Sequence, residues 1–274
     1  MKAKHALILS IVLTILIASN VYLFSNFEKT QRKKVTITRV IDGDTLELED
    51  KSIVRLENIN TPEKSVKGFE EAKEFLAKYE RKKVEIEITG YDKYGRLLGK
   101  IYTPEYANYL QPQSEALADE GSSHSRRDSQ ASRYLNLEIV SEGLATKFLV
   151  SNEEKELFSI AEESAISQEK GIWKKSNYFD CITSEINARN ELIILKSNCG
   201  EINIENWILG DESRKRYEFK SFNLDKLTFH TSSGKDNNTD IFWNLKTNVW
   251  NNDRDTLYLF DSGGELVHHE SYGY

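Results

Sequence analysis

The chain has 274 residues, a formal net charge of −7, and hydrophobic and aromatic fractions of 39% and 11%. This length predicts two domains, and the composition excludes a largely disordered chain. The acidic balance weighs against tight, non-specific binding to nucleic acid, for which lysine and arginine usually supply the affinity, but it is compatible with a hydrolase whose carboxylates hold a metal ion.

Residues 1–34 have the pattern of a targeting segment followed by a short basic tether. Lysines precede an apolar run at residues 6–24, which is long enough to span a bilayer and longer than the ~7–15 apolar residues of a secretory signal. An uncleaved membrane anchor is the favoured interpretation, and a cleaved signal or a buried core helix stays open. Basic residues lie on both sides of the run and so do not set its orientation. We expect export, with the protein extracellular, or membrane-anchored and facing outside.

Residues 35–177 are predicted to form a first domain of strands and helices. β-rich runs with turn residues between them predict strands at 35–40, 45–49, 53–57, 84–88 and 97–102. Apolar residues at helical spacing predict helices at 66–82, 135–144 and 153–170. Trp173 is expected to pack back on the strands. Residues 103–133 lose this periodicity and are predicted to form a long exposed insertion.

Residues 178–274 are predicted to form a second domain. Short β-rich runs alternate with turn signals at even spacing, which predicts an all-β sandwich. Cys181 and Cys199 are the only cysteines of the chain. Export favours a disulfide between them over two buried thiols. The expected fold class is therefore mainly β with helices.

Three short segments carry residue types that phosphodiester hydrolysis uses, namely a base, positive charge on the phosphoryl oxygens and often a hard divalent cation. Asp42 and Asp44 flank a glycine, and their carboxylates could converge on an oxygen-preferring cation such as Ca²⁺, although Asp-Gly-Asp is also a common turn. Arg55 lies mid-strand among apolar neighbours, where a guanidinium needs an anion.

The other two charged residues of interest follow predicted strands. Glu63 comes after Thr61 and Pro62, where it could point into a cleft or stabilise the start of the next helix. Arg96 ends a turn that begins at Asp92. From there it could bind a phosphate with two hydrogen bonds, or simply face solvent.

In order and spacing, these segments resemble the thermonuclease (staphylococcal-nuclease-like) family over roughly residues 35–175. The matching stretches are 40–45, 55–63, 92–96, 142–145 and 169–173. The resemblance implies an OB-type barrel of five strands with helices beside it. It also implies a nuclease activity that depends on Ca²⁺.

The resemblance assigns roles to individual residues. It implies that Ca²⁺ is held by Asp42, Asp44, Asn60 and Thr61. It implies that the catalytic groups are Arg55, Glu63 and Arg96, with Glu63 as a general base acting through water and the arginines on the phosphate. It implies that Lys93 and Tyr94 contact the phosphates of the substrate.

The chain departs from the family pattern at two places. The residue before Thr61 is usually an aspartate that binds the metal, whereas here it is Asn60, whose amide oxygen can bind Ca²⁺ but carries no charge. The tyrosines that flank the nucleotide in well-known members have no clear match near residues 148–150. Phe148 could stack on a base there or pack in the core. The insertion at 103–133 is also unlike a minimal member.

Residues 182–274 resemble the lamin tail domain, most specifically in the stretch 250–253, Trp-Asn-Asn-Asp. This resemblance implies an immunoglobulin-like sandwich, with its tryptophans in the core. Its partner is unknown, and we expect it to position the enzyme by contacting envelope, matrix or nucleic acid.

The sequence therefore predicts an extracytoplasmic, Ca²⁺-dependent endonuclease, expected to be a monomer, that hydrolyses DNA, with RNA as a second candidate substrate. The alternative is a catalytically weak module that binds nucleic acid or envelope. A third hypothesis is a structural envelope protein whose active part is the sandwich.

Overall fold

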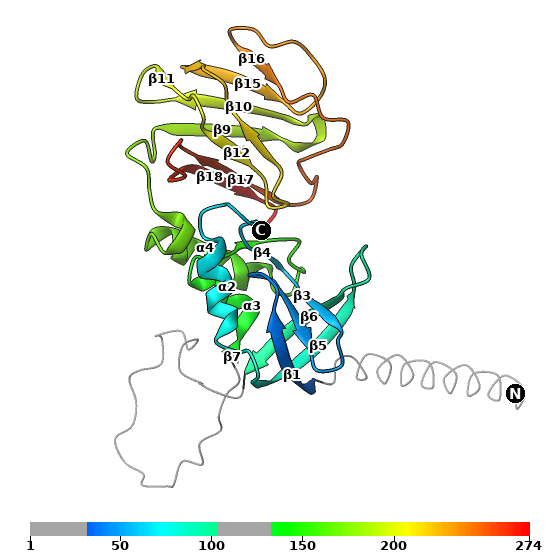
Figure 1. The fold of residues 1–274 in the computed structure, drawn as a ribbon. Coiled ribbons are helices and arrows are strands. Elements are labelled where there is room, and N and C mark those ends of the chain that lie inside the picture. The colour runs from blue at the N-terminus through cyan, green and yellow to red at the C-terminus, as the bar shows by residue number, and fades with distance from the viewer. Residues whose placement is uncertain (1–31, 104–132) are drawn as a thin grey trace, which may run out of the picture.

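The computed structural model describes residues 32–103 and 133–274 (Figure 1). The predicted anchor at 6–24 and nearly all of the predicted insertion at 103–133 lie outside these residues. Among the described residues, no helix is both long and apolar enough to cross a membrane.

The first part of the chain forms a closed barrel. Its strands are β1 (Lys33–Val40), β2 (Thr45–Leu48), β3 (Ile53–Leu56), β5 (Lys83–Tyr91) and β6 (Leu97–Thr103), in the order β3-β2-β1-β5-β6. Parallel pairing of β3 with β6 closes the ring. The short strand β7 (Arg133–Tyr134) pairs with β6. The expected five-stranded OB-type barrel is therefore confirmed, and each strand overlaps a β-rich run of the sequence.

Helices α2 (Phe69–Ala77), α3 (Leu135–Ser141) and α4 (Lys155–Ser167) pack beside the barrel (Figure 1). All three are shorter than the apolar spacing predicts. Helix α2 begins late because Gly68, its N-cap, adopts φ 91°, a left-handed conformation outside the helical region. The side chains of all three helices contribute to one apolar core with the strands.

A tight contact ties the end of α3 to the turn that follows α4. Gly143 and Gly171 have φ values of 68° and 54°, and Ile172 N donates to the carbonyl oxygen of Gly143 at 2.9 Å. A Cβ on Gly143 would lie 2.2 Å from the carbonyl oxygen of Lys170. Glycine is therefore required here both by φ and by space.

One small sheet was not anticipated from the sequence. Strand β4 (Ile59–Asn60) pairs with β8 (Thr146–Lys147). Each strand has only two residues, so neither shows a period-2 pattern. The pairing places Asn60 and Lys147 at the end of the barrel that faces the second domain.

The second part of the chain contains two four-stranded sheets. One has the order β16-β15-β10-β9, made of β9 (Ile182–Asn187), β10 (Leu192–Ser197), β15 (Lys226–His230) and β16 (Asp240–Phe242). The other has the order β13-β12-β17-β18, made of β12 (Ile208–Gly210), β13 (Arg216–Glu218), β17 (Asp255–Phe260) and β18 (Leu266–Tyr272). Strands β11 (Ile202–Asn203) and β14 (Asn223–Leu224) form a separate pair.

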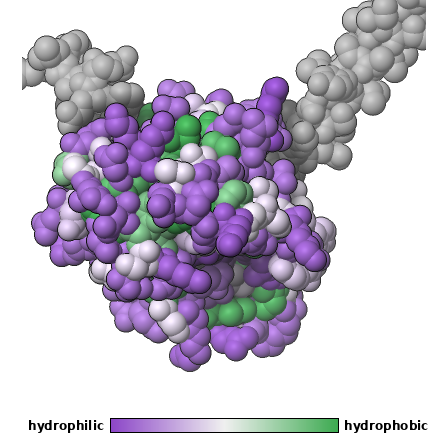
Figure 2. All heavy atoms as spheres, turned by 90° about the horizontal axis from the view of Figure 1, so that it is seen from above, coloured by the Kyte–Doolittle hydropathy of each residue, from purple (hydrophilic) through white to green (hydrophobic). Residues whose placement is uncertain are grey.

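Both four-stranded sheets contribute to one apolar core, so they form a sandwich. Leu195 and Phe229 come from the first sheet and Leu209 and Leu257 from the second, and all four are fully buried. The pairings β9–β10–β15 and β12–β17–β18 are antiparallel, as in an immunoglobulin-like sandwich, whereas β16 pairs in parallel with β15, which departs from that pattern. The face of the sandwich that points away from the barrel is largely hydrophilic, with scattered hydrophobic areas (Figure 2).

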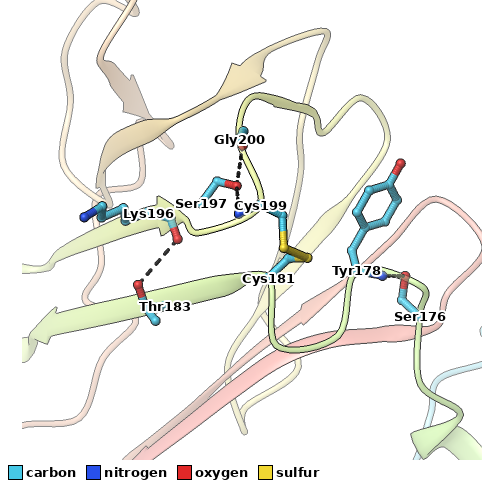
Figure 3. The surroundings of a disulfide bond; sticks show 8 residues. All are labelled: Ser176, Tyr178, Cys181, Thr183, Lys196, Ser197, Cys199 and Gly200. Atoms are coloured by element: carbon cyan, nitrogen blue, oxygen red, sulfur yellow. Dashed lines mark hydrogen bonds between the residues drawn. A yellow bond between two sulfur atoms is a disulfide. The ribbon is translucent and has the colours of Figure 1, made fainter.

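Cys181 and Cys199 are joined by a disulfide, with their Cα atoms 5.3 Å apart (Figure 3). The bridge connects the start of β9 to the loop after β10. It lies beside Ser197, whose hydroxyl donates to the carbonyl oxygen of Gly200 and accepts from Cys199 N. The disulfide therefore closes the edge of the sandwich next to the segment that leads in from the barrel.

The two parts of the chain meet across a buried apolar contact. Trp173 is fully buried, and its ring lies 5.3 Å from that of Tyr258 and 6.3 Å from that of Phe260. The expectation that Trp173 packs back on the barrel strands was wrong: it packs with residues of α4 and of the sandwich. The second domain thus provides the apolar surface that this tryptophan needs.

A buried polar network crosses the same boundary. The ammonium group of Lys147, which is 2% exposed, forms an ion pair with Glu162 of α4 and donates to Thr256 Oγ1 at 2.8 Å. It also lies 3.8 Å from Glu212 of the sandwich. Tyr258 donates its hydroxyl hydrogen to Glu162 Oε1 at 2.8 Å. Because these charged groups are buried together, separating the two parts would be costly.

Candidate active site

Asp42 and Asp44 lie in the turn between β1 and β2. Asp44 is 2% exposed, and its backbone N–H donates to Asp42 Oδ1 at 3.0 Å. The glycine between them is required by space, since a Cβ on Gly43 would lie 2.7 Å from Ala72 Cβ and from Thr61 Oγ1. Burial, together with the charge of Asp44, raises the pKa of Asp42. The turn therefore concentrates negative charge in a position where a cation is favoured.

Arg55 on β3 supplies positive charge to this turn. It is 8% exposed, and it donates to the backbone oxygens of Leu56 and Ile59 at 2.9 and 3.0 Å. Its guanidinium also donates to Asn60 Oδ1 and lies 3.5 Å from Asp44 Oδ2. Burial lowers the pKa of Arg55, and the charge of Asp44 opposes this effect. Asp44 therefore supplies the anion that a guanidinium buried in the middle of a strand needs.

Asn60, Thr61 and Glu63 follow on β4 and in the loop after it. Asn60 and Thr61 are buried, and the backbone N–H of Thr61 donates to Asp44 Oδ2 at 3.3 Å. The side chain of Glu63 is 67% exposed at the rim. The structure thus brings the residues expected to bind the metal together with Arg55 and Glu63.

Arg96, Lys93 and Tyr94 lie on the turn between β5 and β6. Arg96 Nε donates to Asp92 Oδ2 at 2.6 Å. The charge of Arg96 adds to the lowering of the pKa of Arg55 that burial causes. Tyr94 is exposed, with Lys93 Nζ 5.0 Å and the Arg96 guanidinium 5.5 Å from its ring centre. Arg96 is therefore near enough to Arg55 for their charges to interact, while Lys93 and Tyr94 are exposed on the turn.

Phe148 lies at the edge of this cluster. It is half-buried, and the Arg55 guanidinium lies 5.8 Å from its ring centre. Neither of the two hypotheses made for it, base stacking or core packing, is decided by this position.

Sequence analysis missed one residue of the cluster. Arg214, on the turn between β12 and β13 of the sandwich, donates to Asp44 Oδ2 at 2.7 Å and to Asn60 Oδ1 at 2.8 Å. It also forms an ion pair with Glu63. No local pattern marks Arg214, because it is one basic residue in a polar turn more than 150 positions from its partners.

A cleft between the barrel and the sandwich opens beside this cluster. Its lining includes Asn60 and Thr61 from the barrel and Arg214 and Arg216 from the sandwich. Apolar side chains line the rest of the cleft on both sides, among them Ile172 next to the barrel and Phe260 of the sandwich, so the two arginines are basic groups in a mixed polar and apolar lining.

Comparison with known families gives a match over part of the barrel and its helices. Residues 53–175 match the family model described as staphylococcal nuclease homologue. This part of the chain is a staphylococcal nuclease-like domain. The match includes Arg55, Asn60, Glu63 and Arg96, while Asp42 and Asp44 lie just before it. No curated protein was found to match the chain. The match ends before the sandwich, so the lamin-tail resemblance stays a prediction.

The oxygens that the resemblance assigns to Ca²⁺ already accept hydrogen bonds from guanidinium groups. Asp44 Oδ2 and Asn60 Oδ1 both accept from Arg214, and Asp44 Oδ1 accepts from Thr45 Oγ1 at 2.9 Å. Within residues 32–103 and 133–274, no group of three or more His, Cys, Asp or Glu side chains is placed to hold a metal ion. Since Ca²⁺ takes six to eight oxygen ligands, the set does not fit this ion while Arg214 is in place.

Proposed function

We propose that the nuclease-like domain hydrolyses phosphodiester bonds in nucleic acid. The observation that carries the proposal is the convergence of like charges: Arg55 and Arg214 both donate to Asn60 Oδ1. Burial lowers the pKa of Arg55, and the charges of Arg214 and Arg96 add to this effect. Guanidinium groups held near one another in a partly dehydrated site attract an anion such as phosphate. Glu63 lies at the same rim, where a carboxylate can act on a water molecule.

The proposed chemistry is an in-line displacement at phosphorus. Glu63 takes a proton from water, the water oxygen bonds to phosphorus, and the bond to the leaving oxygen breaks. The leaving oxygen takes a proton from solvent. Arg55 and Arg96 donate hydrogen bonds to the phosphoryl oxygens, on which negative charge grows as the displacement proceeds.

DNA is the first substrate that we propose, and RNA is the second. The apolar run at 6–24 supports a location outside the cytoplasm, either secreted or tethered to the membrane, with the sandwich positioning the enzyme. The resemblance to thermonucleases supports Ca²⁺ dependence, but the contacts of Asp44 and Asn60 do not, so no step of the chemistry above is assigned to a metal ion.

A catalytically weak binding module is the second candidate, and one contact favours it. Glu63 is ion-paired with Arg214, so a carboxylate oxygen of Glu63 is engaged by a guanidinium instead of facing a water molecule. Such a module would bind single-stranded nucleic acid through its guanidinium groups and leave it intact.

The test is a cleavage assay with the purified full chain on single- and double-stranded DNA and on RNA, in Ca²⁺, in Mg²⁺ and in chelator. We expect Glu63→Gln and Arg96→Ala each to lower kcat/KM on the order of 100-fold. Glu70→Gln, on the exposed side of α2, is the matched control and should cleave normally. Full activity in the Glu63 and Arg96 variants would refute the assigned site, and binding without any cleavage would establish the module instead.

A further inference from the structure

We propose that Arg214 takes the position and the charge that a divalent cation would have in this site, so that the protein engages phosphate without a metal ion. This inference rests on the proposed function. It makes the sandwich a contributor to the active site, through one side chain from the turn between β12 and β13.

The contacts of Arg214 are those expected of a cation in this site. Its guanidinium lies 2.7 Å from Asp44 Oδ2 and 2.8 Å from Asn60 Oδ1, and it is ion-paired with Glu63. Two of these residues are assigned to the metal by the family resemblance, and the third is the assigned base. A guanidinium that reaches all three occupies the point at which their oxygens converge.

Asn60 fits Arg214 better than an aspartate would. Asn60 Oδ1 accepts from Arg55 and Arg214, while Asn60 Nδ2 donates to the backbone oxygen of Glu212. An aspartate has no N–H to donate, so it would face that backbone oxygen with a second acceptor. The departure from the family pattern is therefore explained by the docking of this turn.

Replacing a divalent cation and an aspartate by Arg214 and Asn60 leaves the net charge of the site unchanged. A divalent cation beside an aspartate at position 60 adds one net positive charge to the site, and Arg214 beside the neutral Asn60 adds the same. A divalent cation placed in the site together with Arg214 would leave two like charges a few ångströms apart, which is unfavourable in a buried setting. Arg214 and a metal ion are therefore alternatives.

The turn is built to present Arg214. Asp211 accepts from Ser213 Oγ at 2.6 Å through Oδ2 and from Lys215 N at 2.8 Å through Oδ1. Between them, Arg214 adopts φ 70°, a left-handed conformation that is uncommon for a residue with a side chain. Such conformations persist where the surroundings hold them, and they cluster at functional sites.

Arg214 is a permanent member of the site because the sandwich is firmly attached. The buried ammonium of Lys147 is shared between Glu162 and Glu212 across the boundary, and Trp173 packs against Tyr258. Moving the sandwich and this turn away would expose these buried groups to solvent. Arg214 is therefore a fixed cation of the site and not a group that leaves to admit a metal ion.

The guanidinium can still bind a substrate. Arginine has five N–H donors, and the contacts above use three of them. The side chain is 22% exposed and borders the cleft. The two remaining donors, Nε–H and one Nη1–H, point in different directions, so each can give a single hydrogen bond to a phosphate oxygen.

The test combines calorimetric titration of the full chain with CaCl₂ and DNA cleavage in chelator. Arg214→Gly is the main variant, because glycine adopts φ near 70° without strain. Asn60→Asp combined with Arg214→Gly rebuilds the family's metal set. Lys215→Ala, which removes a cation of the same turn, is the matched control.

We expect the unaltered chain to bind Ca²⁺ without saturation and to cleave DNA in chelator. Arg214→Gly should lower kcat/KM in chelator on the order of 100-fold, the double variant should bind Ca²⁺ saturably, and Lys215→Ala should change neither result. Saturable Ca²⁺ binding to the unaltered chain, or faster Ca²⁺-dependent cleavage by Arg214→Gly, would overturn the inference.

The calorimetry separates this inference from the proposed function. If no variant cleaves, the proposed function fails. Ca²⁺ binding gained only when Arg214 is absent would then still support the exchange of arginine for metal, and equal binding by all variants would refute it.

Discussion

Lys147 offers the sharpest test of how the two domains hold together. Its ammonium is 2% exposed and contacts Glu162, Thr256 Oγ1 at 2.8 Å and Ser271 Oγ at 3.1 Å, with Glu212 at 3.8 Å. Lys147→Met keeps the length of the side chain and removes the charge. The buried carboxylate of Glu162 then loses its ion-pair partner.

The expected loss follows from that burial. Removing one partner of a buried ion pair costs roughly 3–5 kcal/mol, because the remaining charge is left uncompensated. For a chain of this size, such a loss lowers Tm by roughly 10 °C. The matched control is Lys155→Met, which removes a half-buried lysine that donates to the backbone oxygen of Gly273 at 3.2 Å across the same boundary. This change should cost less than about 1 kcal/mol.

Urea unfolding followed by tryptophan fluorescence and by circular dichroism would measure both variants. Lys147→Met should lower the midpoint and can separate the unfolding of the two domains into two transitions. Adding Glu162→Gln should recover part of the loss, because one unpaired carboxylate is removed. A loss below about 1 kcal/mol for Lys147→Met would refute the reasoning that this network holds the domains together.

Two further predictions concern the sandwich. Burial raises the pKa of Glu212 to about 8, from 4.5 in the unfolded chain. Between these two pH values the folded protein holds a proton on Glu212 that the unfolded chain has released. The free energy of unfolding should therefore fall by about 1.4 kcal/mol per pH unit as pH rises toward 8. Urea midpoints of Glu212→Gln from pH 6.5 to 8 should lack this slope, and an unchanged slope would count against the shift. The disulfide closes a loop with a sequence separation of 18, so Cys181→Ser with Cys199→Ser should cost roughly 3 kcal/mol in a urea unfolding measurement, and a cost near zero would contradict this.

Much of the barrel and part of the site are determined by local sequence. Alternating and β-rich runs predicted each barrel strand, because side chains of a strand point alternately to the core and away from it. The segments around Asp44, Arg55 and Arg96 are recognisable because their residue types and spacing are local properties. The even spacing of turns in the last 90 or so residues likewise predicted a sandwich.

Tertiary structure alone decided what these residues contact. Arg214 reaches Asp44 across a sequence separation of 170, and Asn60 reaches Glu212 across 152. Trp173 packs on the sandwich, where the rings of Tyr258 and Phe260 lie against it. Such contacts depend on how two separately folded domains dock, and no periodicity within either domain encodes that. The sequence therefore determined which groups are available for chemistry. The docking of the domains decided that Arg214 lies against Asp44 and Asn60.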